Sequence, residues 1–245
     1  MSTRPCLQPL ALPLVLAALA AFASNACASG LQVAPTGLEF ASGAASEALW
    51  LTNTGDEELR AQVRAFEWTQ ADDSDRLTPT QKLVASPPML VLAPGQRQLV
   101  RVIRPQSAPG VGESAFRLLV DELPKDAQAS GVQYVLRYSV PVFVGGPAQD
   151  AAAALEWKAH VEPGALVLEA HNRGARRAQL AGVEWLAPGS GAVELVPGLL
   201  GYVLAGSTMR WSVDAPSARA VDAARVRIKV DGEPVEFALS PDPAR

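Results

Sequence analysis

Residues 132 to 143 read Val-Gln-Tyr-Val-Leu-Arg-Tyr-Ser-Val-Pro-Val-Phe, and every even-numbered position in this stretch is apolar. Successive side chains of a β-strand point to opposite faces, so a period of two predicts a long strand rather than a helix. Pro141 has no N–H to donate to a sheet ladder, which places that end of the strand at a sheet edge or beside a bulge. A long edge strand with an apolar row is an aggregation hazard unless another chain pairs with it. We therefore expect this segment to lend a strand to a partner.

The rest of the chain reads as two series of short strands. Its 245 residues are enough for two domains of about 100 residues each. Strand-like runs separated by turn signals extend from Leu31 to Phe143, and after Gly145-Gly146-Pro147 a second series begins. No long amphipathic helix competes, and no internal repeat between the halves is evident. We predict an all-β protein of two immunoglobulin-like β-sandwich domains in tandem, residues 29–147 and 148–245.

The first 28 residues have the features of an export signal. Arg4 precedes an apolar run from Leu10 to Phe22, and Ala26-Cys27-Ala28 supplies a cleavage site before Ser29. The run is too short to cross a bilayer of roughly 30 Å as a helix. We therefore expect a signal peptide over residues 1–28 and an exported protein that is not embedded in a membrane.

Cysteine content and net charge further limit the class of protein and its possible partners. Both cysteines, Cys6 and Cys27, lie in the predicted signal, so the mature chain depends on core packing instead of disulfides. A lipid anchor on Cys27 is an open alternative. The formal net charge is -4, and loss of Arg4, the only charged residue of the signal, makes it -5. This balance argues against nucleic acid as a partner.

Signals of catalysis or cofactor binding are weak. His160 and His171 are the only candidates for a base at neutral pH, and neither a Gly-x-Ser-x-Gly elbow nor a phosphate-binding glycine loop is present. We expect no enzyme, no nucleotide and no other cofactor. The two histidines with nearby glutamates could bind zinc, and the loop Asp72–Asp75 could bind calcium, but solvated turns are favoured over a metal for both. Trp50 and Trp68 are expected in the core of the first sandwich.

Several short motifs follow one another in the first half. They are Asn53 with Gly55, Trp68-Thr69-Gln70, Ser86-Pro87-Pro88, Leu92-Ala93-Pro94-Gly95, Phe116-Arg117-Leu118 and Glu122-Leu123-Pro124. In order and spacing they resemble the periplasmic chaperones of the chaperone-usher pilus pathway, the PapD-like family, over about residues 31 to 147. The Glu-Leu-Pro motif and the Tyr-Ser-Val-Pro-Val-Phe strand are most similar to the archaic branch, which assembles spore-coat-U-like pili. The resemblance is thin over the second domain.

The resemblance implies an L-shaped pair of domains and a chaperone that works in the periplasm without ATP. Such a chaperone inserts the last long strand of its first domain into a pilus subunit that lacks its own final strand, and an outer-membrane usher then takes the subunit over. By alignment the donor side chains are Val132, Tyr134 and Leu136, with Tyr138 as a fourth. Three of them, fully buried, would contribute roughly 5 to 9 kcal/mol before ordering is subtracted. Self-association of the free chaperone through this strand is a further open point.

One departure from the family concerns the subunit's terminal carboxylate. Classical members hold it with an arginine near the start of the first strand and a lysine late in the last strand, whereas this chain has Gly37 and Pro141 at those positions. A carboxylate still needs a cationic partner, preferably a planar bidentate one. Arg117 and Arg137 are the candidates on the flanking strands, and Arg101 is a weaker third. The alternative for each arginine is an ordinary surface role.

The basic cluster Arg173, Arg176 and Arg177 is interpreted as a charged turn, with an acidic partner such as the usher as the alternative. Two other functions remain open for the whole chain. A two-domain adhesive surface subunit would need an N-terminal extension of alternating apolar residues, and only a few residues precede the first strand. A carbohydrate-binding module would need an exposed aromatic platform, yet aromatic residues make up 6% of the chain.

Overall fold

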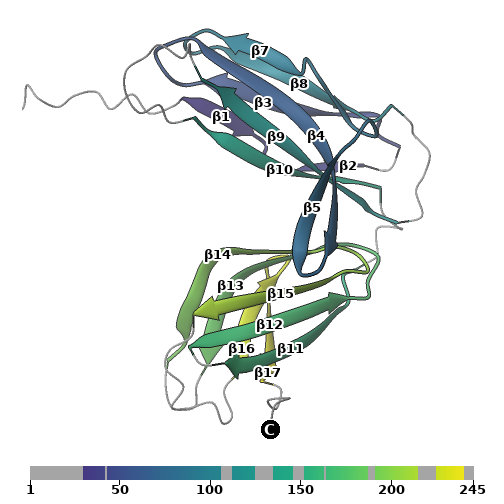
Figure 1. Ribbon diagram of the computed structural model, residues 1–245, viewed down its shortest axis with the longest axis vertical. Coiled ribbons are helices and arrows are strands. Elements are labelled where there is room, and N and C mark those ends of the chain that lie inside the picture. Colours follow the sequence, from purple (N-terminus) through teal and green to yellow (C-terminus); the bar gives the residue numbers. More distant parts are fainter. Residues whose placement is uncertain are drawn as a thin grey trace, which may run out of the picture.

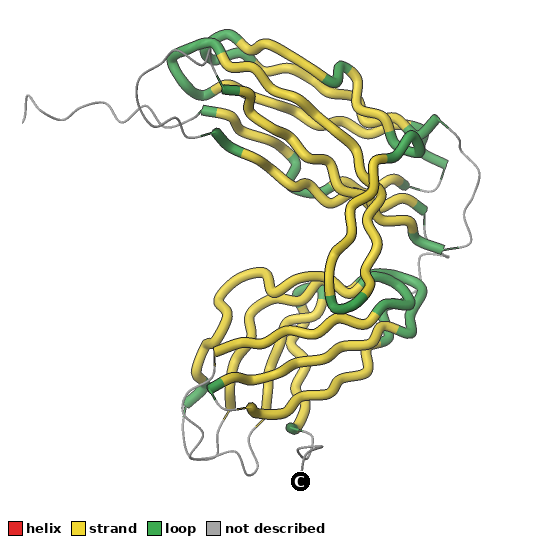
Figure 2. The backbone as a smooth tube through the Cα atoms, in the orientation of Figure 1, coloured by secondary structure: helices red, strands yellow, loops and turns green. Residues whose placement is uncertain are grey.

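All regular structure in the described part of the chain is β-strand, which confirms the predicted all-β class (Figure 2). None of it forms a helix of the length and apolarity that a bilayer span requires. The donor positions Val132 and Tyr134, the predicted signal and the predicted boundary between residues 147 and 148 lie outside the described residues. The computed structural model describes residues 30–41, 43–105, 112–124, 135–145, 152–162, 164–186, 191–214 and 225–239.

The first sandwich consists of two sheets that face each other. One sheet has the strand order β1-β3-β8-β6, and the other has the order β2-β10-β9-β4-β5, with β7 paired to the start of β4. The strands are β1 (Leu31–Ala34), β2 (Leu38–Phe40), β3 (Ser46–Asn53), β4 (Leu59–Ala71), β5 (Ser74–Pro79), β6 (Val84–Ser86), β7 (Met89–Leu92), β8 (Arg97–Ile103), β9 (Ser114–Leu123) and β10 (Arg137–Val144).

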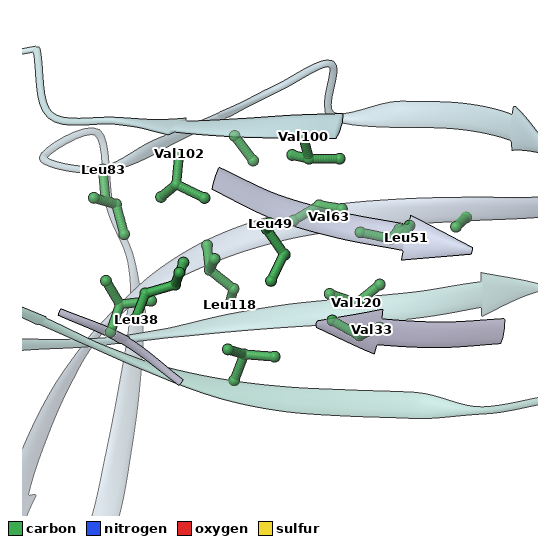
Figure 3. Packing of buried hydrophobic residues seen from close by; sticks show 14 of the residues in the cluster. Val33, Leu38, Leu49, Leu51, Val63, Leu83, Val100, Val102, Leu118 and Val120 are labelled. Carbon is green, nitrogen blue, oxygen red and sulfur yellow. The ribbon is translucent and has the colours of Figure 1, made fainter. Parts of the chain in front are cut away.

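Alternating apolar positions of both sheets meet in the core of this sandwich (Figure 3). Leu49 and Leu51 of β3 are fully buried, and so are Leu118 and Val120 of β9 on the opposite sheet. Each such side chain contributes about 1.5 to 3 kcal/mol when it leaves water. The two sheets are therefore held face to face without any cross-link.

The second sandwich has the sheets β11-β12-β15 and β14-β13-β16-β17. Its core is built in the same way around the fully buried Leu166, Leu168, Leu180 and Ile228. Two immunoglobulin-like domains in tandem, as predicted, are thereby confirmed. The strands are β11 (Leu155–Glu162), β12 (Ala165–Asn172), β13 (Ala178–Leu186), β14 (Val193–Val203), β15 (Thr208–Asp214), β16 (Arg225–Val230) and β17 (Glu233–Ala238).

The two sandwiches are set at an angle and leave an open concave side between them, in agreement with the implied L shape (Figure 1). The β4–β5 hairpin extends from the first sandwich onto the second (Figure 1). At its end Gln70 donates from Nε2 to the carbonyl of Tyr202 at 2.8 Å, and Gln70 Oε1 accepts the N–H of Leu204 at 2.8 Å. One side chain thus makes two hydrogen bonds across the domain boundary.

A cluster of charges joins the domains at a second place. The side chain of Glu113 is 5% exposed, and it accepts the backbone N–H of Arg177 at 2.9 Å and Arg177 Nη1 at 2.5 Å. Glu39 pairs with both Arg176 and Arg177. Burial raises the pKa of the Glu113 carboxyl, although the hydrogen bond from the Arg177 backbone opposes this shift. Arg176 and Arg177 are therefore part of the contact between domains, a role that the interpretation as a plain charged turn did not include.

Candidate functional site

Strand β10 has an edge that is open over part of its length. On one side it pairs with β9 from Arg137 to Val144. On the other side it pairs with β2, in parallel, only at Val142–Val144. Within the described residues the edge of β10 from Arg137 to Pro141 therefore has no neighbouring strand. The edge position that the missing N–H of Pro141 predicted is found here.

The side chains of β10 change their surroundings along the strand. Val140 and Val142 are buried in the first sandwich. Tyr138 packs against the same core, and its hydroxyl donates to the carbonyl of Leu31 on β1 at 2.6 Å. Leu136, the preceding residue on this face, is 37% exposed, while its carbonyl accepts the N–H of Glu122 at 2.9 Å. The apolar row thus passes from the protein's own core to solvent between Tyr138 and Leu136.

The outer face of the same sheet carries an aromatic cluster where it meets the second domain. Trp68 and Phe143 come from the first sandwich and Tyr202 from the second, with ring centroids 5.5 to 5.9 Å apart. Trp68 is 2% exposed, yet it packs against the second domain and not between the sheets of the first. Trp50 is only half-buried and lies under the guanidinium of Arg97. The prediction that both tryptophans belong to the first core is therefore wrong: the second domain covers Trp68, and Trp50 lies half-buried on β3 of the other sheet.

Arg117 lies on this face at the inner end of the open edge. It is directly opposite Pro141 in the β9–β10 register. Its guanidinium carbon is 3.8 Å from the centroid of the Trp68 ring, and Nη1 is 3.5 Å from the carbonyl oxygen of Ser139. Burial lowers the pKa of the Arg117 guanidinium from its usual value. Within the described ranges Arg117 makes no ion pair, so it is a partly desolvated cation whose charge is not neutralised by a direct contact.

Arg137, by contrast, is already paired. Its Nε contacts Asp121, and Nη2 of Arg64 lies 2.6 Å from the other oxygen of the same carboxylate. Burial by itself raises the pKa of the Asp121 carboxyl, but the hydrogen bonds from Arg64 and Arg137 outweigh burial and lower this pKa. Arg101 is exposed on β8 in the other sheet of the sandwich. Of the three candidate arginines, the structure brings Arg117 and Arg137, but not Arg101, to the face beside the open edge.

The two positions where other family members carry their anchor lie against each other. A Cβ added to Gly37 would be 3.6 Å from the ring of Pro141. Strand β2 begins one residue later and takes up the edge of β10 from that point. A cavity of about 360 Å³ opens here between the domains. It is lined by Thr36, Gly37, Leu38, Glu39, Pro141, Phe143, Arg177, Gln179, Tyr202 and Asp231.

Comparisons with known proteins agree with this geometry. Residues 30–148 match the family model described as pili and flagellar-assembly chaperone, PapD N-terminal domain. Among curated proteins no relative was found. The first domain is therefore of the PapD N-terminal type.

Solved structures extend the likeness over both domains. A chain in the crystal structure of the CsuC–CsuE chaperone–tip adhesion subunit pre-assembly complex, from archaic Csu pili of Acinetobacter baumannii, is 24% identical with a TM-score of 0.67, covering 86% of this chain and 99% of that one. The Pseudomonas aeruginosa CupB2 chaperone is 20% identical with a TM-score of 0.58, covering 85% and 100%. The YadV chaperone is 18% identical with a TM-score of 0.61, covering 85% and 98%. These matches do not favour the surface-subunit or carbohydrate-binding alternatives.

Proposed function

We propose that the protein is a periplasmic chaperone that binds pilus subunits of the spore-coat-U-like type by donating a β-strand, without ATP, and delivers them to an outer-membrane usher. The observation that carries the proposal is the open edge of β10 between Arg137 and Pro141, next to a row that reaches solvent at Leu136. Open edges of this kind are normally covered or blunted. A subunit that lacks a strand would cover it by pairing with the edge.

The geometry of β2 supports a defined end point for the bound chain. β2 runs parallel to β10 on the side that the subunit strand would occupy. A strand added along Arg137–Pro141 therefore has to stop before β2 begins at Leu38. The terminal carboxylate of a chain that ends there arrives beside Pro141, directly across from Arg117.

Arg117 is the cation that suits this carboxylate best. It is fixed by stacking on Trp68, and among the described residues it makes no ion pair, although the charge of Asp75 acts on it from a greater distance. Arg137 would first have to give up Asp121, and Arg101 belongs to the other sheet. A carboxylate accepted by a guanidinium in a partly desolvated place makes a strong charge-assisted hydrogen bond. We assign the anchor to Arg117.

The donor row would supply most of the remaining affinity. Leu136 is the first described member, and the proposal adds Val132 and Tyr134, which follow the same period of two. Tyr138 is already bound to the core and to Leu31, so it supports the donor strand from within. Each apolar side chain that becomes buried in a subunit groove contributes about 1.5 to 3 kcal/mol.

Co-expression with a spore-coat-U-like subunit from the same source, followed by co-purification, tests the proposal. Leu136→Glu should abolish the complex while the free protein unfolds as before, because the charge would be buried only in the bound groove. The matched control is Val235→Glu, because Val235 is 36% exposed on β17 of the second domain and lies outside the proposed contact. An unchanged yield of complex with Leu136→Glu would refute the donor assignment.

The remaining parts of the proposal have their own readouts. Export and cleavage before Ser29 would be seen as a mature N-terminus by mass spectrometry of periplasmic extract. Capping of the open edge by a second copy would give a concentration-dependent dimer that Leu136→Glu removes. Usher delivery would appear as transfer of the bound subunit to purified usher, with no nucleotide added.

A further inference from the structure

We propose that both domains together recognise the last residue of the captured chain: the Tyr202 hydroxyl is a second donor to the carboxylate held by Arg117, and the cavity between the domains takes the terminal side chain. This inference rests on the proposed function and adds a binding residue and a side-chain preference to it.

Tyr202 is held in place but has an unused hydrogen-bonding group. Its ring packs edge-on against Trp68 with centroids 5.5 Å apart, and its backbone carbonyl is fixed by Gln70. The guanidinium carbon of Arg117 lies 5.5 Å from the centroid of the Tyr202 ring. In the described part of the chain the hydroxyl of Tyr202 makes no hydrogen bond, although partly buried tyrosines usually find a partner. An oxygen atom of a carboxylate on Arg117 would provide one.

The charges around the cavity favour binding of the carboxylate on the side of Arg117 over the side of Arg177. Arg177 also lines the cavity, but it is bound to Glu113 and Glu39. The three carboxylates Glu39, Glu113 and Asp231 outnumber the two guanidiniums of Arg176 and Arg177, so this part of the wall is negative on balance. A further carboxylate would therefore be repelled from the Arg177 side and attracted to Arg117.

The same wall selects the terminal side chain. Pro141, Phe143 and Leu38 form its apolar part, while Glu39 and Asp231 disfavour an acidic group. A volume of about 360 Å³ is at the small end for ligand pockets, which suits one side chain and not a longer segment. We infer a preference for an uncharged, bulky residue at the end of the bound chain and discrimination against aspartate or glutamate.

The test uses the full mature chaperone in complex with a spore-coat-U-like subunit. Purified complexes are mixed with an excess of fluorescently labelled wild-type chaperone, and the rate at which the subunit passes to the labelled protein is measured. Tyr202→Phe keeps the ring and removes only the hydroxyl. It should speed release by about tenfold or more, since tenfold is the lower end of the effect of a hydrogen bond to a charged group.

Two subunit variants separate a contact with the carboxylate from a structural role. In a subunit extended by Gly-Gly the carboxylate is displaced, so wild-type chaperone and Tyr202→Phe should release it at equal rates. A subunit whose last residue is replaced by Asp should be released faster than the unaltered one by both chaperones. Equal release of the unaltered subunit by wild type and Tyr202→Phe would overturn the role of Tyr202, and so would a tenfold difference that persists after the extension.

The outcomes also separate this inference from the proposed function. Should the Asp-ended subunit be held as long as the unaltered one, the cavity does not take the terminal side chain. Should no complex with wild-type chaperone form at all, the proposed function itself is refuted, and so is the proposed role of Tyr202. A complex that is lost with Leu136→Glu but indifferent to every change at Tyr202 and at the subunit's end leaves strand donation intact and refutes only the two-domain recognition.

Discussion

The last strands of the two sandwiches, β10 and β17, both leave an edge without a neighbouring strand in the described residues, and they differ in what lies along that edge. In the second domain β17 pairs with β16 along its whole length, and its sequence contains Glu233, Pro234 and Glu236. Charge and proline are common means of protecting an edge from unwanted pairing. In the first domain the open part of β10 also contains a charge and a proline, Arg137 and Pro141, but Arg137 is paired with Asp121 and the exposed apolar Leu136 precedes it. An open edge is thus common to the last strands of both domains, and β10 differs in that β2 covers part of its edge and sets the end of the open part.

The two domains are otherwise closely matched at one corner. Asn53 and Asn172 are 1% and 0% exposed. In each case Oδ1 accepts the N–H of the glycine two residues later at 2.9 Å, and Nδ2 donates to two carbonyls at 2.7 and 3.0 Å. The comparison therefore isolates the edge: the same corner occurs in a domain whose last strand is partly covered by β2 and in a domain whose last strand has no neighbour on its outer side in the described residues.

The largest effect is expected from breaking that shared corner. Asn53→Ala and Asn172→Ala each leave buried carbonyls and an N–H without partners, so each should lower the free energy of unfolding of its own domain by about 3 to 5 kcal/mol. Urea denaturation followed by tryptophan fluorescence measures this. Thr54→Ala, which removes one exposed hydroxyl contact to Gly30, is the control and should change stability by less than about 1 kcal/mol. A large loss in one domain only would show that the corners are not equivalent.

Next comes the difference between the two arginines beside the open edge. Arg117→Ala should weaken subunit capture by about 2 to 3 kcal/mol, because a partly desolvated charge loses its partner. Arg137→Ala should weaken capture much less, since Arg137 is already bound to Asp121. The exchange assay described above, applied to complexes of each variant, compares the two losses. Equal losses of binding affinity for both variants would mean that Arg117 and Arg137 hold the carboxylate together.

A smaller effect follows from the ion cluster at the start of β10. The pKa of Asp121 is lowered below its ordinary value of 3.8, so the unfolded chain takes up the proton first as the pH falls. The stabilisation from Asp121 is therefore complete above that value and is lost as the pH drops through the lower, folded pKa. Asp121→Asn should reduce stability at pH 7 and flatten the acid side of the stability curve for the first domain. Unfolding by urea between pH 7 and pH 2 gives the comparison, and an acid limb as steep as that of the wild type would contradict it.

The smallest effect concerns the contact between the domains. Gln70→Ala removes two hydrogen bonds to the second domain and should reduce the coupling between the two unfolding transitions by about 1 to 2 kcal/mol. Gln62→Ala is the matched control on the same strand, because Gln62 lies far from the end of the hairpin. Differential scanning calorimetry would show whether the transitions separate. Transitions that stay merged in Gln70→Ala would assign the coupling to the charge cluster of Glu39 and Glu113 instead.

Much of the fold was predictable because it depends on local patterns. The period of two around Tyr138 and Val140 and the missing donor of Pro141 identify an edge strand directly. The Asn-x-Gly corners are also visible in the sequence, as Asn53-Thr54-Gly55 and Asn172-Arg173-Gly174. Their equivalence was missed because two isolated turn signals do not look like a repeat until both are seen in the same place of a sandwich.

The site was less predictable because it depends on contacts between distant segments. Nothing in the sequence tells that Trp68 is covered by Tyr202, or that Arg137 is neutralised by Asp121 while Arg117 is not. The cavity needs residues from both domains, and the contact of Arg177 with Glu113 that borders it spans 64 residues of sequence. Such pairings follow from the angle between the domains, which local patterns do not encode.

The short strand β2 has one more consequence. Because it fills the rim of the sheet from Val142 onward, the space left beside β10 has a fixed length. On the proposed function, β2 limits the length of chain that can pair with β10. Binding of a subunit then depends on where its C-terminus lies along β10, whatever the rest of its sequence. One chaperone could then serve several different subunits, provided that their tails end in register.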